Sequence, residues 1–370
     1  MKNTMKVLYI CFADFNRVDS GSSVRPQKMY KAFLDRGHEI KLLCGSDGND
    51  CREERKKNVA EINAWLNSEK PDICYIESPT GAIMLDCDIR LIKRIHRMGV
   101  PIGYFMRDFH SKFPEIFPRR KGFVNSLKDL YLDIRQEKTF ALLNNVDIVY
   151  LPCDETKALF EYPDMRALPP AGENHWIDKS GGGCTGIYVG GISQHYSLGE
   201  LLDAYAILCE NGEKYRLILC ARENEWESFE HSHKNAEWLE IHHASGEELA
   251  DLYSKADIGL LIPKAGSAYN DVTLSVKIFE YMSYGLPIVA AHCVAMDNVI
   301  NKYSVGITTN NAPRDFADAI KKMFDDKISY DSFRANEKTA LLNGNLWVHR
   351  VDTIIDDLSK KARRPLYYDV

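Results

Sequence analysis

The chain has 370 residues, of which 47 are Lys or Arg and 53 are Asp or Glu, so its formal net charge is −6. At about 150 residues per domain, this length predicts two domains. Charged residues at 27% and hydrophobic residues at 45% are typical of a folded globular protein and argue against a disordered chain. The negative net charge argues against a dedicated nucleic-acid-binding protein.

In the first half of the chain, short apolar runs alternate with segments of helical length. Strands are expected at 6–12, 39–44, 73–77, 102–106 and 146–151, and helices at 26–37, 52–69 and 86–98. Continuous apolar strands joined by helices predict a parallel sheet that is covered on both faces. Residues 1–167 are therefore expected to form a first α/β domain.

The composition changes at 168–185, where LPPAGENHWIDKSGGGCT is rich in Gly and Pro, as is typical of an interdomain linker. The alternation then resumes, with strands expected at 186–189, 216–220, 239–242, 258–262 and 287–290, and helices at 198–210, 246–255, 275–284 and 313–324. A second α/β domain is expected over 186–345, and a C-terminal helical segment over 346–370 can cross back to the first. Two such domains create a cleft between the carboxyl ends of their sheets, where ligands usually bind.

Ten cysteines are scattered along the chain without any CxxC pair. This distribution is typical of reduced thiols and predicts neither a disulfide framework nor a zinc site. No apolar run reaches the ~20 residues that span a bilayer, and the N-terminus lacks a secretory signal pattern. We expect a cytoplasmic protein, with a peripheral position at the inner face of the membrane as the alternative.

The most informative motif is NDVTLSVKIFEYMSYGLPIVAA at 270–291. A loop enters a helix near Leu274, and the backbone N–H groups at a helix N-terminus suit a diphosphate. Lys277 and Glu280 lie three residues apart on one face of this helix. The lysine can neutralise phosphate charge, and the carboxylate can accept hydrogen bonds from ribose hydroxyls. The alternative is an ordinary exposed ion pair on an amphipathic helix.

The segment SVKIFEYMSYGLPIVA closely resembles the donor-site helix of retaining GT-B glycosyltransferases, family 4 in particular, in which P-x-K-x-x-E-Y-x-x-x-G-x-P-V-V is common. Further segments agree with this family in order and spacing: the glycine-rich loop SGSSVRP, then GHEIKLL, LPPAGEN, YVGGI and ELADLYSKADIGLLIP. The resemblance implies the GT-B architecture of the α/β class, with two Rossmann-like doubly wound parallel-sheet domains facing each other across a cleft. The first domain would bind the acceptor and the second the nucleotide sugar.

The resemblance also implies roles for individual residues. Glu280 would bind the donor ribose, and Lys277 would reinforce the contact with the diphosphate. The other expected donor-binding residues act through their backbones: the N–H groups of Leu274, Ser275 and Val276, the loops at Gly21, Ser22, Gly190 and Gly191, and the nucleobase contacts at His243 and Ala244.

Three positions depart from the family pattern. The family often has two glutamates separated by seven residues, but Val272 occupies the first position and the nearest acid is Asp271. The Arg and Lys that commonly bind diphosphate after YVGG are absent, and only His195 is offered in that loop. Where many members have a His after the fourth strand, this chain has Arg107, which can supply the missing positive charge.

A second candidate site is MRDFH at 106–110, directly after an expected strand. Arg107, Asp108 and His110 form the expected catalytic group, in which Asp108 can position an acceptor hydroxyl or act on its proton. His110 can hydrogen-bond the acceptor or the sugar, and Arg25 in SSVRP is an expected acceptor or phosphate ligand beside Asp108. The alternatives are a structural Arg–Asp pair with a loop histidine, and a surface salt bridge for Arg25.

Residues 112–131 interleave phenylalanines with Arg119, Arg120 and Lys121. Basic charge beside aromatic side chains suits an anionic membrane surface or a lipid-linked pyrophosphate, whereas a helix packed on its own domain is the alternative. No metal site is expected, since the pair His231 and His233 has no neighbouring carboxylate cluster.

The sequence therefore predicts a hexosyltransferase-type glycosyltransferase that moves a sugar from a nucleoside-diphosphate donor to a hydroxyl of a glycan or lipid-linked acceptor, in cell-surface polysaccharide synthesis. A helix N-terminus and Lys277 can stabilise the leaving diphosphate without a metal or another cofactor. The resemblance implies retention of the anomeric configuration. The alternatives are a sugar-nucleotide epimerase on the same scaffold and a catalytically degenerate binding partner.

Overall fold

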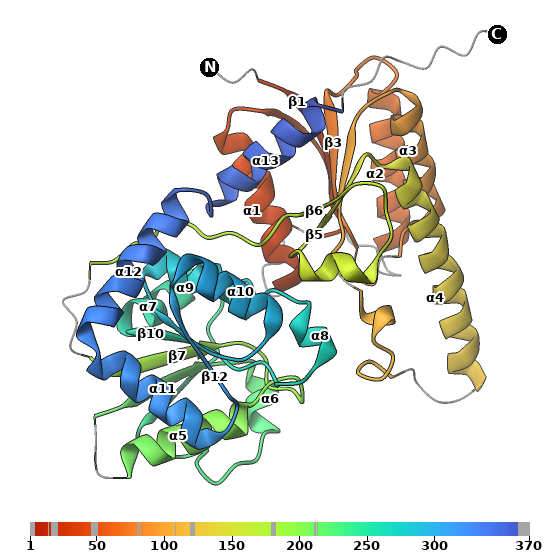
Figure 1. The fold of residues 1–370 in the computed structure, drawn as a ribbon. Coiled ribbons are helices and arrows are strands. Elements are labelled where there is room, and N and C mark those ends of the chain that lie inside the picture. Colours follow the sequence, from red (N-terminus) through yellow and green to blue (C-terminus); the bar gives the residue numbers. More distant parts are fainter. Residues whose placement is uncertain are drawn as a thin grey trace. The chain divides into compact units, whose positions relative to one another are not determined.

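The computed structural model describes residues 4–13, 15, 21–45, 51–79, 81, 83–107, 109–118, 123–178, 183–210, 212 and 214–361, without the side chains of 21–23 and 123–127. The chain divides into two compact units (Figure 1). Unit 1 comprises Met1–Pro169 and Trp347–Val370, and unit 2 comprises Pro170–Leu346. The chain therefore passes between the units twice, and unit 1 is built from two separate segments.

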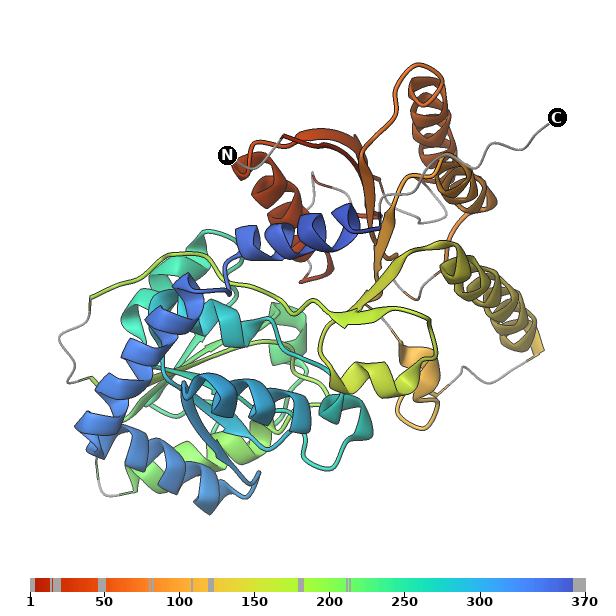
Figure 2. The same ribbon diagram turned by 45° about the horizontal axis from the view of Figure 1, so that its top comes forward.

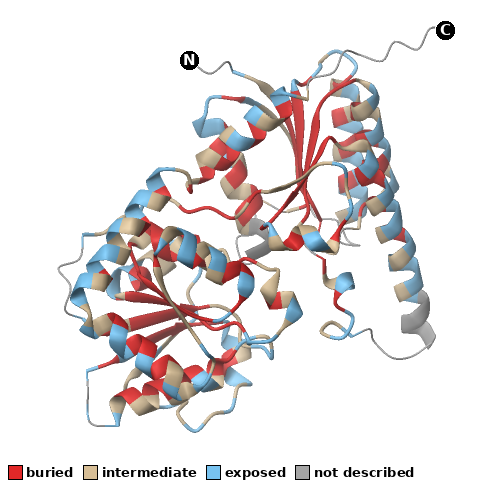
Figure 3. Cartoon of the chain, in the orientation of Figure 1, coloured by how far each residue is buried: buried red, intermediate tan, exposed pale blue. Residues whose placement is uncertain are grey.

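Unit 1 is built on a six-stranded sheet in the order β2-β1-β3-β4-β5-β6, in which all neighbours are parallel. Its strands are β1 (Lys6–Ile10), β2 (Glu39–Leu43), β3 (Ile73–Glu77), β4 (Ile102–Phe105), β5 (Ile148–Leu151) and β6 (Met165–Ala167). The central strands β3, β4 and β5 are buried at every position, as their apolar runs predict (Figure 3).

Helices cover both faces of this sheet. On one face, α1 (Gly21–Asp35) lies beside α13 (Trp347–Ser359) (Figures 1 and 2), and Arg36 after α1 pairs with Asp352 at 2.6 Å. On the other face lie α2 (Arg52–Trp65) and α3 (Asp86–Arg97), followed by the long helix α4 (Phe123–Leu142). A side chain at Gly103 in β4 would lie 3.2 Å from Leu358, so α13 closes directly over the centre of the sheet.

The segment 21–25, expected to belong to a loop, is helical, because α1 begins at Gly21 and not near Pro26. Proline has a helical φ, but inside a helix it removes one backbone hydrogen bond and its ring crowds the carbonyl four residues earlier. Pro26 also contributes a tertiary contact, since its carbonyl accepts a hydrogen bond of 2.9 Å from the Tyr9 hydroxyl. The prediction failed because it treated Pro26 as the start of the helix.

Unit 2 repeats the same design with the strand order β12-β11-β10-β7-β8-β9. Its parallel strands are β7 (Thr185–Val189), β8 (Arg216–Cys220), β9 (Leu239–His242), β10 (Ile258–Leu261), β11 (Ile288–Ala291) and β12 (Gly306–Thr309). The strand order reverses between β7 and β10, and open α/β sheets usually bind ligands at the carboxyl ends of the strands beside such a reversal.

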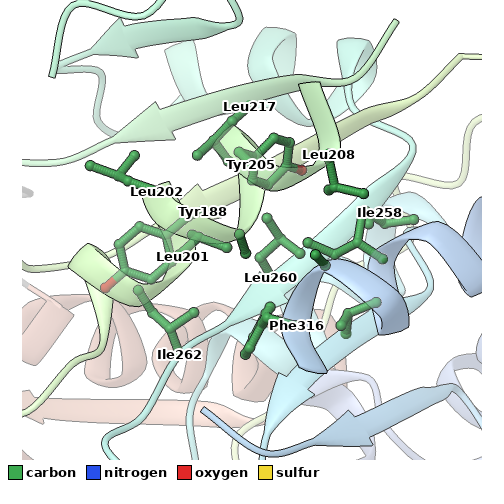
Figure 4. Close-up of a cluster of buried hydrophobic side chains, with 14 of the residues drawn as sticks. Tyr188, Leu201, Leu202, Tyr205, Leu208, Leu217, Ile258, Leu260, Ile262 and Phe316 are labelled. Carbon is green, nitrogen blue, oxygen red and sulfur yellow. The ribbon is translucent and has the colours of Figure 1, made fainter. Parts of the chain in front are cut away.

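The core of unit 2 holds the sheet between two groups of helices. On one face, α5 (Leu198–Cys209) packs against α11 (Pro313–Asp325) over a buried apolar cluster that includes Leu201, Leu260 and Phe316 (Figure 4). On the other face, α9 (Lys277–Tyr284) packs against α7 (Glu248–Lys255) and α12 (Lys327–Leu342). α10 (Val294–Tyr303), which follows β11, also packs against α12. In the described part of the chain, no helix combines the length and the hydrophobicity that a membrane crossing requires.

Candidate functional site

The N-terminus of α9 has free hydrogen-bond donors. Phe279 and Glu280 donate their N–H groups to the Val276 carbonyl at 3.1 and 3.2 Å, which closes the first turn. Within the described residues, the N–H groups of Leu274, Ser275 and Val276 meet no acceptor. Three successive free amides at the positive end of a helix can bind an anionic group.

The Ser275 side chain binds the first residue of α9, since its Oγ accepts a hydrogen bond of 3.2 Å from the Lys277 N–H. At the other end, Gly285 adopts a φ of +66° and ends α9 in the left-handed conformation that glycine favours. The helix begins two residues later than the sequence predicts, so the expected diphosphate contacts come from the loop just before it.

The side chains of Lys277 and Glu280 meet on the first turn of α9. Lys277 Nζ lies 2.6 Å from Glu280 Oε2, which also accepts a hydrogen bond of 2.7 Å from the Tyr253 hydroxyl. The Lys277 and Glu280 side chains are 20% and 26% exposed, so they differ from the freely exposed ion pair considered as the alternative. Burial, and then the neighbouring Glu280 carboxylate, raise the pKa of Tyr253 well above its ordinary value, so its hydroxyl stays protonated.

The glycines after β7 lie at the carboxyl edge of the same sheet. The Gly190 N–H donates to the Cys220 carbonyl at 3.1 Å, and the Gly191 carbonyl accepts a hydrogen bond of 2.8 Å from the Tyr188 hydroxyl. A side chain at Gly190 would lie 2.6 Å from that hydroxyl oxygen, which explains the need for glycine here. Glu225, which the sequence did not single out, anchors the loop by accepting the Ile192 N–H at 2.7 Å.

His243 and Ala244 follow the carboxyl end of β9. The Nδ1 atom of His243 lies 2.8 Å from the Ala221 carbonyl, and the Ala244 carbonyl accepts a hydrogen bond of 3.3 Å from the Cys220 thiol. Burial raises the pKa of Cys220, and the positive charge of Lys277 acts against this rise.

Asp271 and His195 lie near positions at which the sequence departs from the family pattern, and the structure shows their contacts. Asp271 ends the short helix α8 (Ala268–Asp271), and its carboxylate accepts the Val294 N–H at 3.2 Å, at the start of α10. The Asp271 carboxylate is thus bound to the start of α10 and does not replace the glutamate that is missing at position 272. The His195 carbonyl accepts hydrogen bonds from the Lys264 N–H at 2.9 Å and the Asn270 side chain at 3.3 Å.

In unit 1, the MRDFH segment lies at the carboxyl end of β4. The Arg107 N–H donates to Ser78 Oγ at 3.0 Å, and His110 opens a short 3-10 helix with its ring 4.2 Å from that of Phe117. Asp108 lies outside the described residues, as do the basic residues Arg119, Arg120 and Lys121. Gly21 and Ser22 form the first turn of α1, and their side chains are not described.

Arg25 lies inside unit 1 and forms a buried network. Its Nε atom is 3.1 Å from Glu77 Oε1, which also accepts a hydrogen bond of 2.7 Å from the Tyr75 hydroxyl. The guanidinium carbon stands 3.6 Å from the centre of the Phe105 ring, and Nη1 donates to the Pro169 carbonyl at 3.3 Å. The pair is therefore not a surface salt bridge. A charged residue at the end of the apolar run ICYIE was the available signal for Glu77.

Among the described residues, no three His, Cys, Asp or Glu side chains are grouped so that they could hold a metal ion. His231 and His233 both approach Asp203, at 3.4 and 3.7 Å, but no further ligand completes the group.

Comparison with known proteins finds a family match within unit 2. Residues 184–326 match the family model Glycosyl transferases group 1. No curated protein matches the sequence of this chain.

Solved structures match almost the whole chain in fold, at low sequence identity. Sucrose-phosphate synthase from Thermosynechococcus elongatus superposes with a TM-score of 0.64 at 11% identity, covering 96% of this chain and 99% of its own. A glycosyltransferase from Rickettsia africae gives 0.65 at 11% identity, covering 98% of this chain and 100% of its own. HepE from Anabaena, in complex with UDP, gives 0.65 at 14% identity, covering 96% and 100%.

Two parallel α/β sheets in separate units, matched by these solved structures over almost the whole chain, give the protein the GT-B fold. Within unit 2, residues 184–326 are similar to the group 1 glycosyltransferases. The sequence prediction of this fold is confirmed, and the family match over 184–326 agrees with the prediction of a glycosyltransferase.

Proposed function

We propose that the protein transfers a sugar from a nucleoside-diphosphate donor to a hydroxyl of a glycan or lipid-linked acceptor. One observation carries the proposal: three free amides, an ammonium group and a carboxylate meet at the start of α9. This set matches a diphosphate joined to a ribose, because amides and ammonium bind phosphate oxygens while the carboxylate accepts hydroxyl protons.

The same groups can drive the reaction. When the bond between the sugar and the diphosphate breaks, negative charge grows on the leaving phosphate oxygen. The amides of Leu274, Ser275 and Val276 and the ammonium of Lys277 are fixed before the reaction begins, so they stabilise this charge without reorganisation. The proposal includes retention of configuration and independence of metal, with Arg107, Asp108 and His110 facing the acceptor.

Similar solved structures suggest the first ligands to test. HepE from Anabaena is described with UDP-glucose, and an α-glucosyltransferase with UDP-glucose and DNA. WaaG is described as a glycosyltransferase of lipopolysaccharide biosynthesis, which supports a lipid-linked glycan as one acceptor class and cell-surface polysaccharide as one product class. Peripheral contact of 112–131 with an anionic membrane, from the cytoplasmic side, belongs to the same proposal.

The test is calorimetric titration with UDP, GDP and ADP, followed by nucleotide release from the matching sugars. Glu280→Ala and Lys277→Ala should each weaken binding of the preferred nucleotide at least about tenfold, since each removes a charged hydrogen-bonding group. Lys255→Ala, which removes an exposed cation from α7, should leave binding unchanged. The proposal fails if no nucleotide binds, or if both site variants bind like the wild type.

A second candidate is a degenerate protein that binds a nucleotide sugar without transferring it. The contact of Asp271 with the Val294 N–H favours this candidate, because it leaves Val272 without a substitute carboxylate. The two candidates separate in the same experiment. Nucleotide binding that depends on Glu280, without release of nucleotide from any sugar donor or acceptor tested, would support the degenerate protein.

A further inference from the structure

We propose that Tyr253 is a positioning residue that holds Glu280 in the orientation in which it recognises the donor ribose. The inference rests on the proposed function, and it assigns a task to a side chain that belongs to a different helix from the rest of the site. Tyr253 lies on α7 and is 2% exposed, so it does not reach the donor itself.

The geometry fixes one oxygen of the Glu280 carboxylate and leaves the other available. Glu280 Oε2 accepts hydrogen bonds from Tyr253 Oη at 2.7 Å and from Lys277 Nζ at 2.6 Å. Within the described residues, Glu280 Oε1 meets no donor. Oε1 is therefore the oxygen that can accept a ribose hydroxyl, while Oε2 is held from behind.

Lys277 alone cannot hold this orientation when a donor binds, because the diphosphate competes for its ammonium group. The Tyr253 hydroxyl has no such competitor. It is a neutral group, and its ring is confined by Tyr284, 4.8 Å away, and by Tyr281, 5.9 Å away. The hydroxyl also accepts a hydrogen bond of 3.3 Å from Lys277 Nζ, so it links both charged side chains.

Loss of the hydroxyl therefore affects recognition of the ribose more than packing. In Tyr253→Phe the ring and its aromatic neighbours remain, but among the described residues Glu280 keeps only Lys277 as its partner. The carboxylate must then either follow Lys277 or turn away when Lys277 engages the diphosphate. A purely structural role for Tyr253 would change stability without changing the preference for a ribose that carries its hydroxyls.

The experiment compares affinities for a nucleoside diphosphate and for its 2′,3′-dideoxy form, starting from whichever of UDP, GDP and ADP binds most tightly. The wild type should prefer the ribose form at least about tenfold, because a hydrogen bond to a charged group contributes this much. Tyr253→Phe should reduce the preference to less than about threefold. Tyr284→Phe is the matched control, since it removes a hydroxyl from the neighbouring ring and should keep the wild-type preference.

A second variant tests the inference without altering Tyr253. In Lys277→Met, Tyr253 is the remaining partner of Glu280, so overall affinity should fall while the preference for the ribose form is retained. Loss of the preference in Lys277→Met, or its retention in folded Tyr253→Phe, would overturn the positioning role. A wild type and a Glu280→Ala variant with equal preference would instead overturn the proposed donor site as a whole.

Discussion

Replacing Arg25 by methionine would leave Glu77 as a buried carboxylate without its cation. Arg25 is 7% exposed and Glu77 is 1% exposed, and their closest atoms are 3.1 Å apart. The only other hydrogen bond to Glu77 Oε1 comes from the Tyr75 hydroxyl, and Oε2 has no partner among the described residues. Breaking a buried pair by removing one partner costs about 3–5 kcal/mol, because the remaining charge has lost its compensation.

Two further features determine how much Arg25→Met lowers the free energy of unfolding. Methionine keeps an unbranched apolar stem of similar length, so only a small cavity term is expected. The cation that stands 3.6 Å from the centre of the Phe105 ring is lost, which adds about 1–2 kcal/mol. We therefore expect Arg25→Met to lower the free energy of unfolding by at least about 3 kcal/mol. The double variant Arg25→Met with Glu77→Gln should recover about 2 kcal/mol, since it removes the stranded charge.

Urea unfolding measures both free energies, and hydrogen exchange assigns the loss to a unit. Exchange should accelerate in β1, β3 and β4 and stay unchanged in the sheet of unit 2. The reasoning is refuted if Arg25→Met costs less than about 0.5 kcal/mol, the range of a surface substitution. It is also refuted if the double variant is less stable than the single one.

Burial raises the pKa of Cys11 and of Cys293 to about 12. At pH 8 a thiol reagent should therefore modify only the four half-buried cysteines of the folded protein. Modification of more than four cysteines before unfolding would contradict the structure. Arg166 lowers the pKa of Asp164, so the stabilisation by this carboxylate is present above its ordinary pKa and is lost as the pH falls through the lowered one. Asp164→Asn should thus cost about 0.5–1 kcal/mol at pH 7, and this difference should shrink below about pH 4; a constant difference in acid would argue against the pair. Gly285→Ala should lower the free energy of unfolding in urea by at least about 1 kcal/mol, because residue 285 has a φ of +66° and a side chain there would lie 2.9 Å from the Trp176 ring. Unchanged stability would exclude the left-handed conformation.

The sequence predicts the central strands well but misses two strands that lie at sheet edges. Ile73–Glu77 and Arg216–Cys220 have the bounds that their apolar runs indicate, because a strand covered on both faces has a continuous apolar signal. β6 and β12 were missed. Both lie at the edge of a sheet and have only half-buried residues, so their sequences carry no such signal.

In the candidate site, the sequence predicts local contacts but not long-range ones. Lys277 and Glu280 are neighbours on one helix, so their motif reveals them. Tyr253 meets Glu280 across 27 residues and Glu225 meets Ile192 across 33, and no local pattern predicts contacts that depend on the tertiary fold. The burial of Arg25 was hidden for the same reason, since its partner Glu77 is 52 residues away.

Because the chain is synthesised from its N-terminus, the two units can complete their folding at different times. Unit 2 is continuous, so it can complete its sheet while later residues are still being made. The sheet of unit 1 is finished early, but the apolar surface around Gly103 stays open to solvent until Leu358 and the rest of α13 arrive. The earlier-made unit is therefore the later one to mature, and chaperones have the longer opportunity to bind it.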